Sequence, residues 1–245
     1  MARKDTSQKK SSFELAIQQA CERAMDPAIA QTGLDMTKIE NNRSMQLAEM
    51  EKCRNNPVYW MGHYYTTFDP RIEDPEGREV NFNLFPRQIE LHNWATERIK
   101  KRQIGLVAKS RDSGMSVYFG AWFVHSWLFE RGFVGGFGSA IEEKLDKLGD
   151  MSSLMEKLRF SIRRFPKWMM PKGMNCDKHL MHRRIINPEN GSIIIGEIGD
   201  QIGRGGRAAR YCIDEAAFIE HPDLMESALS ATTPNRFYVS TPNGL

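Results

Sequence analysis

The loop that ends at Ser116 combines residue types that hold phosphate. It reads Leu-Val-Ala-Lys-Ser-Arg-Asp-Ser-Gly-Met-Ser and joins an apolar run to an apolar helix. In the standard phosphate loop, GxxxxGK[ST], backbone N–H groups cradle phosphate, the lysine neutralises it and the hydroxyl holds magnesium. Gly114 and Ser116 fit this pattern, whereas Lys109 replaces its first glycine and Met115 its lysine. The missing charge can come from Lys109 or Arg111, and the helix N-terminus also favours an anion.

Two later segments end in side chains that suit nucleotide chemistry. The run Tyr-Cys-Ile-Asp-Glu ends in Asp214 and Glu215. In phosphoryl-transfer enzymes such an Asp holds magnesium, and the following Glu can polarise the attacking water. The run Tyr-Val-Ser-Thr-Pro-Asn-Gly carries small hydroxyl and amide groups that can sense a γ-phosphate. Taken singly, the three segments also fit an ordinary charged turn, two surface acids that begin a helix, and a plain turn.

The elements around these segments predict an α/β fold. Apolar runs predict strands at 104–108, 132–138, 192–196, 210–214 and 236–240. We expect the first of these strands to be buried. Helical patterns occur between them, at 86–102, 116–130, 140–149 and 151–164. Strands that alternate with helices imply a mainly parallel sheet with ligands at the carboxyl ends of the strands.

The N-terminal part reads as a polar tail and two helices. We expect one helix from Ser12 and a second from Asp35 to Arg54, before Asn-Asn-Pro. A short aromatic helix follows at 56–65, and 80–86 alternates like a strand. We therefore divide the chain into an appendage, residues 1–55, and a main domain, residues 56–245.

Composition excludes some classes of protein. Hydrophobic residues make up 40% of the 245 residues and charged residues 27%, so a large core can form. The net charge of +3 does not by itself indicate a nucleic-acid binder. No segment is long and apolar enough for a membrane span or a secretory signal. The four cysteines form no CxxC pair, which favours a reduced compartment. Cys176, His179 and His182 have ligand-like spacing, but their basic surroundings argue against a metal.

In this order, the phosphate loop, the acid pair and the Ser-Thr-Pro-Asn-Gly segment resemble the ATPase domain of the large terminase subunit of tailed bacteriophages. The resemblance runs from Asn56 to Leu245 and includes Phe82–Gln88, which looks like the family's adenine-recognition segment. In that family an apolar residue can replace the loop lysine, so Met115 is an expected feature. The resemblance implies a P-loop NTPase of the RecA/ASCE-like type, with a mainly parallel sheet flanked by helices.

The resemblance also implies a role for each candidate residue, with ATP and Mg²⁺ as cofactors. Glu215 would activate water, and Lys109 and Arg111 would contact the β- and γ-phosphates, with Arg111 favoured because its planar fork suits phosphate oxygens. Ser116 and Asp214 would hold magnesium. The other implied residues are those of ATP binding, Gln88, Ser110, Gly114, Met115 and Ser116, and those that couple hydrolysis to movement, Ser240, Thr241 and Asn243.

The activity implied is that of a motor that hydrolyses ATP to drive double-stranded DNA into a procapsid. Its implied partners are double-stranded DNA, the capsid portal, the small terminase subunit and further copies of itself in a ring, with a monomer as the alternative for the isolated chain. We expect no membrane partner. We expect it in the host cell cytoplasm during virion assembly and not in the mature virion. The family continues into a nuclease domain beyond these residues, so we expect no nuclease activity from this chain alone.

Two basic segments are candidates for further contacts. Arg204 and Arg207 lie in a glycine-rich run before the acid pair, where an arginine finger, a DNA-backbone contact and a solvated loop are equally open readings. Residues 159–184 hold eight basic residues against Asp177, a net charge of +7. We expect DNA contacts there without sequence specificity, chiefly from Arg163, Arg164, Lys167, Arg183 and Arg184.

Two other functions remain open at this point. One is another P-loop DNA translocase or helicase. The other is a non-catalytic DNA-binding or capsid-assembly module whose phosphate loop has degenerated.

Overall fold

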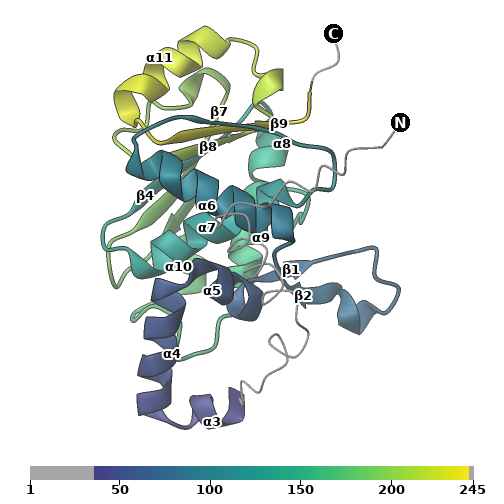
Figure 1. The fold of residues 1–245 in the computed structure, drawn as a ribbon, viewed down its shortest axis with the longest axis vertical. Helices are drawn as coiled ribbons and strands as arrows, with labels where there is room; N and C mark the ends of the chain where they lie inside the picture. Colours follow the sequence, from purple (N-terminus) through teal and green to yellow (C-terminus); the bar gives the residue numbers. More distant parts are fainter. Residues whose placement is uncertain (1–35, 243–245) are drawn as a thin grey trace, which may run out of the picture.

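A seven-stranded sheet organises the computed structural model, which describes residues 36–242 (Figure 1). The strands lie in the order β3-β9-β8-β4-β7-β6-β5. The first five are parallel, and at one edge β6 pairs antiparallel with β7 and β5 pairs antiparallel with β6. Their bounds are β3 Gly105–Ala108, β9 Arg236–Ser240, β8 Arg210–Asp214, β4 Val134–Ser139, β7 Ile193–Ile198, β6 Arg184–Ile186 and β5 Leu180–Met181. The predicted α/β class and mainly parallel sheet are confirmed.

The strand β3 is less buried than its apolar sequence suggests. It lies at the edge of the sheet with only β9 beside it, and Leu106 is 79% exposed. The expectation of a buried strand is therefore wrong for one of its faces. Leu106 lines a cavity of ≈ 470 Å³ together with Ala216, Met225 and Tyr238.

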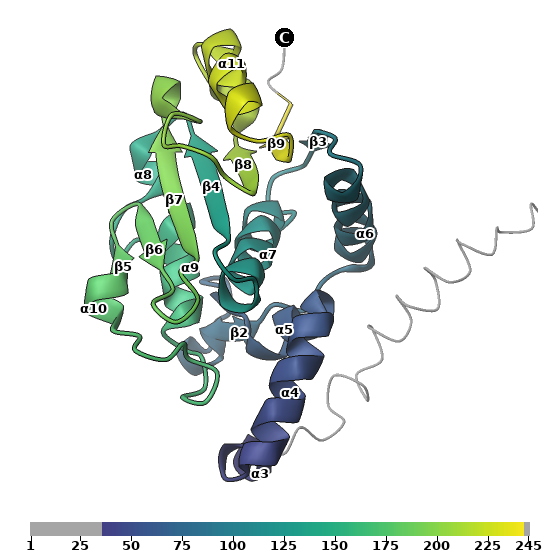
Figure 2. The same ribbon diagram turned by 90° about the vertical axis from the view of Figure 1, so that its left-hand side faces the viewer.

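Helices cover the two faces of the sheet unequally (Figure 2). The larger core lies on the face with the central helix α7, and a smaller one, with Ile202, Tyr211 and Leu229, lies beneath α11 on the other face. The helices of the larger core are α5 Pro57–Tyr64, α6 Pro86–Lys100, α7 Met115–Phe129, α8 Glu142–Leu145 and α9 Leu154–Ile162. The remaining elements after residue 56 are α10 Cys176–His179, α11 Pro222–Thr232, a two-stranded sheet of β1 Thr66–Phe68 and β2 Glu79–Asn81, and the short 3-10 helices 75–78, 199–201 and 216–218.

The apolar helix α7 is enclosed, as predicted, because nearly every face of it meets another element. It packs against α5, α9, β4 and β7, and residues 118–128 are all buried. The glycines of β4 let aromatic rings approach the strand closely. A Cβ on Gly136 would lie 2.1 Å from the ring of Tyr211. Only glycine fits at this position without moving the ring.

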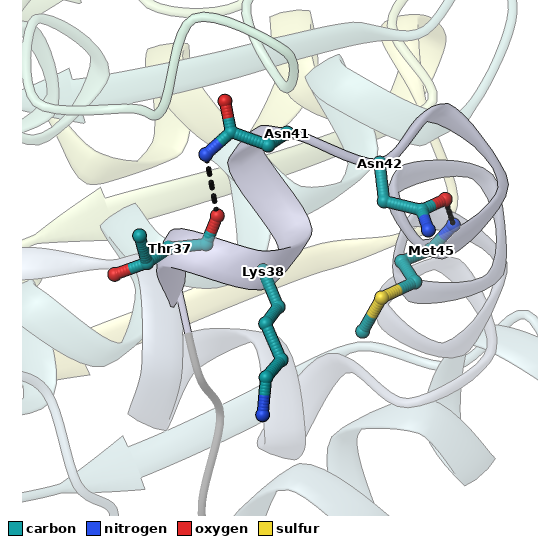
Figure 3. Close-up of a pocket in the computed structure, with 5 residues that line it drawn as sticks. All are labelled: Thr37, Lys38, Asn41, Asn42 and Met45. Atoms are coloured by element: carbon teal, nitrogen blue, oxygen red, sulfur yellow. Dashed lines mark hydrogen bonds between the residues drawn. The ribbon is translucent and has the colours of Figure 1, made fainter.

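The N-terminal helix predicted for 35–54 is interrupted. The structure has α3 Met36–Glu40 and α4 Arg43–Asn55 instead of one helix. The side chain of Asn42 caps α4 by accepting hydrogen bonds from the backbone N–H of Ser44 and Met45 at 3.0 and 3.1 Å. Figure 3 shows this elbow, where Asn41 donates back to the carbonyl of Thr37. An asparagine favours caps over helix interiors, which explains the break. The helix expected from Ser12 lies outside the described residues.

Two general features of the described part bear on function. None of its helices is long and apolar enough to cross a membrane. Within residues 36–242, no three His, Cys, Asp or Glu side chains are grouped to hold a metal ion. The spacing of Cys176, His179 and His182 thus makes no such group, and His179 instead accepts a hydrogen bond from the backbone N–H of Asn175 at 3.0 Å.

Candidate nucleotide site

The predicted phosphate loop and acid pair meet at one edge of the sheet. Because β3, β9 and β8 are parallel neighbours, their carboxyl ends lie together, with Ala108 beside Ser240 and Val239 beside Asp214. The backbone N–H of Lys109 extends this pairing by donating to the carbonyl of Ser240 at 2.9 Å. The three segments singled out in the sequence thus form one site.

A hydroxyl and a carboxylate face each other at the start of α7. The hydroxyl of Ser116 donates to Oδ2 of Asp214 at 2.6 Å, although the two residues are 98 positions apart in the chain. Gly114 precedes the helix with a left-handed φ of +70°, and a Cβ there would lie 2.8 Å from Nε2 of Gln88. Glycine is therefore required at this turn. A hydroxyl and a carboxylate are oxygen ligands that suit Mg²⁺, which keeps waters and substrate phosphates as its other ligands.

Lys109 binds the second acid of the pair. Its Nζ lies 2.9 Å from Oε1 of Glu215 and 4.0 Å from Oδ1 of Asp214, and its side chain is only 10% exposed. The carboxylate of Glu215 also accepts hydrogen bonds from Ser240 and Thr241, at 3.4 and 3.2 Å. Because the Lys109 ammonium group is so enclosed, it is held between the carboxylates of Asp214 and Glu215. If it turned to solvent, it would leave both carboxylates without their ion-pair partner.

Opposing effects act on the pKa of the Glu215 carboxyl group. Partial burial alone would raise its pKa, but the hydrogen bond and the charge of Lys109, with Thr241, lower it below its ordinary value. Its carboxylate is therefore ionised at neutral pH. The backbone is strained at this residue, with φ at +53°, which few residues other than glycine adopt. Such strain is often found at functional sites.

The second basic residue of the loop is placed differently. Arg111 is exposed, and no hydrogen bond or ion pair joins its side chain to the described residues. Ser110 lies beside it, and its carbonyl accepts from the hydroxyl of Ser113 at 2.9 Å. The structure therefore brings Lys109, not Arg111, to the acid pair, although the shape of the guanidinium favoured Arg111 for the phosphates.

Gln88 is tied to the phosphate loop, a contact that its sequence position did not reveal. Its Oε1 accepts from the backbone N–H of Phe85 at 2.9 Å, and its Nε2 donates to the carbonyl of Ser113 at 3.0 Å. The residue is 1% exposed. Both polar ends are thus engaged, so reading an adenine edge, which remains a prediction, would require an exchange of these partners.

Hydrogen bonds to the backbone of Gly203 hold the start of the glycine-rich run that contains Arg204. The carboxylate of Glu197 accepts from the backbone N–H of Gly203 at 2.6 Å and from the hydroxyl of Tyr211 at 2.5 Å. The hydroxyl of Thr232, at the end of α11, donates to the carbonyl of Gly203 at 2.6 Å. Gly203 therefore lies against α11 and not at the acid pair.

Both arginines of this run are exposed. Neither Arg204 nor Arg207 has an ion-pair partner among the described residues. The sequence did not reveal the hydrogen bonds among Gly203, Glu197, Tyr211 and Thr232, because the three side chains come from three separate elements. Only the glycines at 203, 205 and 206 signalled that the backbone is closely confined there.

Half of the eight basic residues in segment 159–184 pair with acids that lie outside the segment. Arg159 is fully buried between Asp146 and Glu156, so the sequence count of +7 overstates the surface charge. Arg163 binds Glu156 at 3.0 Å. Arg164 pairs with Glu79 and Arg183 with Glu142. Of the predicted DNA-contacting residues, Lys167 and Arg184 are exposed and have no ion-pair partner within the described part.

Comparisons with known proteins agree with this architecture. The sequence matches no protein-family model and no curated protein. Among solved structures, the large terminase of bacteriophage HK97 is similar at 9% sequence identity with a TM-score of 0.54. The likeness covers 77% of this chain and 37% of the HK97 chain. The chain shares the fold of a phage large terminase.

A second likeness is looser. The large terminase ATPase domain of Thermus phage P74-26 is 18% identical and covers 59% of this chain and 61% of its own, with a TM-score of 0.42. That score does not establish a common fold, so the structural argument rests on HK97. At 9% identity, the likeness to the HK97 terminase is evidence for the fold alone. The case for the site rests on its own geometry. The coupling residue Asn243 lies outside the described residues.

Proposed function

We propose that this chain binds and hydrolyses ATP with Mg²⁺ and is the motor part of a viral DNA-packaging terminase. The observation that carries the proposal is the meeting of two residue pairs at one edge of the sheet. Ser116 contacts Asp214 at 2.6 Å, and Lys109 contacts Glu215 at 2.9 Å. Together they provide magnesium ligands, a phosphate-binding charge and a general base, the components that phosphoryl transfer requires.

Each residue of the site has a distinct task. Ser116 and Asp214 would hold the metal, which when bound neutralises charge on the phosphates. The backbone N–H groups after Gly114 and the positive end of α7 would face the phosphates. Lys109 would leave Glu215 for a phosphate oxygen, because a phosphate offers it a stronger charged acceptor. Glu215, freed of that pair, would accept a proton from the attacking water.

The coupling segment touches the same carboxylate. Thr241 and Ser240 both donate toward Glu215, so a change at this acid is passed directly to the end of β9. We propose that Ser240 and Thr241, with Asn243, relay hydrolysis to a movement of the chain. Arg204 and Arg207, being exposed and outside their own site, would act on the nucleotide of a neighbouring subunit in a ring.

Packaging itself is the furthest part of the proposal. The fold shared with the HK97 large terminase and the ordered motifs support DNA translocation into a procapsid. The partners would be double-stranded DNA, the portal and the small terminase subunit, in the host cytoplasm during assembly. An assembled ring would supply the arginine in trans, so hydrolysis by the isolated chain would be slow.

Nucleotide binding is the primary test because it does not require a ring. Calorimetry with a non-hydrolysable ATP analogue should show binding that needs Mg²⁺ and that Asp214→Asn abolishes or greatly weakens. Asp200→Asn, which removes an exposed carboxylate outside the site, is the matched control and should bind like the wild-type protein. Failure of the wild-type protein to bind in the presence of Mg²⁺ and DNA would favour a non-catalytic module. A forked duplex that the protein unwinds would favour a helicase.

A further inference from the structure

Gln88 joins the start of α6 to the phosphate loop. Its Oε1 accepts from the backbone N–H of Phe85, the residue that precedes the helix, at 2.9 Å, as the third residue of a capping box does. Its Nε2 donates to the carbonyl of Ser113, 25 positions later in the chain, at 3.0 Å. The residue is 1% exposed, so water does not compete for either bond. The side chain is thus a fixed bridge between the helix and the loop.

Further contacts hold α6 in place one turn beyond Gln88. The ring Nδ1 of His92 lies 3.1 Å from the hydroxyl of Tyr118, in the first turn of α7. The same ring packs edge-on against Trp122 of α7, with the ring centroids 5.5 Å apart. Residues four apart lie on one face of a helix, so this face of α6 contacts both the loop and the helix that follows it. Gln88 therefore holds the loop from a fixed position.

The backbone of the loop around Ser113 is unusual. Asp112 and Gly114, on either side of Ser113, both have a left-handed φ, of +58° and +70°. An aspartate adopts this region only at some cost, and a glycine adopts positive and negative φ about equally well. The local sequence therefore does not by itself fix how the peptide between Ser113 and Gly114 is turned. Backbone of this kind keeps one conformation where surrounding contacts determine it, and the hydrogen bond from Gln88 is such a contact.

The direction of that peptide decides which of its groups faces a ligand. In a trans peptide the C=O and the N–H point to opposite sides, and none of the described peptides is cis. While the carbonyl of Ser113 accepts from Gln88, the N–H of Gly114 therefore points away from Gln88. No hydrogen bond within residues 36–242 uses this N–H. The N–H groups of a phosphate loop bind phosphate oxygens, whereas a carbonyl turned the same way would repel them.

We propose that Gln88 is a positioning residue of the candidate nucleotide site. It holds the peptide between Ser113 and Gly114 with its N–H available to phosphate, and it does not read the base. The inference deepens the proposed function and rests on it. To reach a base, the buried side chain would have to leave the N–H of Phe85 and the carbonyl of Ser113 unpaired, which is costly. The part of the substrate to which Gln88 responds is thus the triphosphate, whichever base it carries.

The test compares ligands that share a triphosphate, each with Mg²⁺: inorganic tripolyphosphate and non-hydrolysable analogues of ATP and of GTP. Calorimetry measures their affinity for the wild-type protein and for Gln88→Met, which keeps most of the side-chain volume and removes both hydrogen bonds. The substitution should weaken the binding of every ligand by the same factor, roughly threefold to tenfold, because a loop that is not held must be ordered on binding. Gln103→Met is the matched control, since Gln103 is exposed just beyond the end of α6, and it should bind like the wild-type protein.

NMR provides a second reading, part of which needs no variant. In the wild-type protein, the side-chain amide resonances of Gln88 should be the same in the complexes with tripolyphosphate and with the ATP analogue, because the bond to Ser113 is kept in both. Without ligand, the backbone amide resonance of Gly114 should broaden or split in Gln88→Met and stay unchanged in Gln103→Met. A loss of stability alone would not produce this signature at Gly114.

The outcomes separate this inference from the proposed function. A loss of affinity confined to the ATP analogue, or Gln88 side-chain resonances that move only when a base is present, would mean that Gln88 exchanges its partners for the base and would overturn the proposal. Normal wild-type binding with an unaffected Gln88→Met variant rejects only the role of Gln88. If the wild-type protein binds none of the ligands, the proposed function fails and this inference fails with it.

Discussion

The candidate nucleotide site and the basic segment 159–184 both gather charged side chains, but they do so in opposite ways. In the site, residues far apart in the chain converge, and Ser116 meets Asp214 across 98 positions. In the basic segment, residues close in sequence diverge to separate partners. Arg159 turns into the core and Arg164 pairs with Glu79, 85 positions away.

The difference shows why motifs at strand ends predict which residues come together better than a count of charges predicts the surface charge. The residues of the site occupy the ends of parallel strands, and the sheet brings those ends together whatever lies between them. A run of basic residues carries no such constraint, because long side chains reach acids on other elements. The local charge of the segment thus depends on tertiary partners that its own sequence does not contain.

The largest effect is expected at the acid of the site that binds Lys109. Glu215→Gln should lower ATP hydrolysis by about 10²- to 10⁴-fold, because it removes the base but keeps the shape of the side chain. Steady-state phosphate release measures the effect, and Glu220→Gln, an exposed neighbour, is the control. A variant with the wild-type rate would remove Glu215 from the mechanism.

Next in size is the loss of stability at the buried arginine of the basic segment. Arg159→Met leaves the carboxylate of Asp146, which is fully buried, without its arginine partner. The free energy of unfolding should fall by about 3–5 kcal/mol. Arg163→Met, at a position 41% exposed, should cost about 1 kcal/mol or less. Urea denaturation of both variants separates a structural from a surface arginine, and equal losses would contradict the contrast.

DNA binding should depend on the cations that remain unpaired. Replacing Lys167 and Arg184 by alanine should reduce the slope of log affinity against log salt by roughly two, one for each phosphate contact. Replacing Arg163 and Arg164 should reduce it less, since acids already neutralise both. Fluorescence anisotropy with duplex DNA at several salt concentrations measures both slopes. The reverse order would mean that DNA displaces these ion pairs.

The smallest effect concerns the surface pair of Arg164 and Glu79. The hydrogen bond from Arg164 lowers the pKa of Glu79 below its ordinary value. A lowered pKa stabilises the folded state above the ordinary glutamate pKa, and this stabilisation is lost as the pH falls through the lowered value. Glu79→Gln should lower the free energy of unfolding by about 0.2–1 kcal/mol at neutral pH. In acid, the variant and the wild-type protein should be equally stable. Denaturation at both pH values tests this, with Glu73→Gln as the control; a loss that persists in acid would refute it.

Much of the fold follows from the sequence because its elements are long or strongly apolar. The five parallel strands and the helices α5, α6 and α7 appear where they were predicted. The hairpin of β5 and β6 was missed because its strands are two and three residues long and lie within the basic segment. The break at Asn42 was missed because no proline or glycine marks it within residues 35–54.

The site divides in the same way. The convergence of the phosphate loop with Asp214 and Glu215 could be predicted from strand ends and a parallel sheet. The direction of long, flexible side chains could not. Gln88 turns toward Ser113, and Lys109 turns toward Glu215. Such contacts depend on how α6 and the end of β3 lie against their neighbours, which a local pattern does not encode.

The glycine in the middle of β4 has a consequence at the molecular surface. Gly136 leaves space for the ring of Tyr211, the hydroxyl of that ring holds Glu197, and Glu197 holds the backbone just before Arg204. A methyl group added at Gly136 would displace the ring and loosen this chain of contacts. The backbone before an exposed arginine is thus held through the space that a glycine leaves for an aromatic ring inside the sheet, and damage to the core here would change the position of that arginine at the surface.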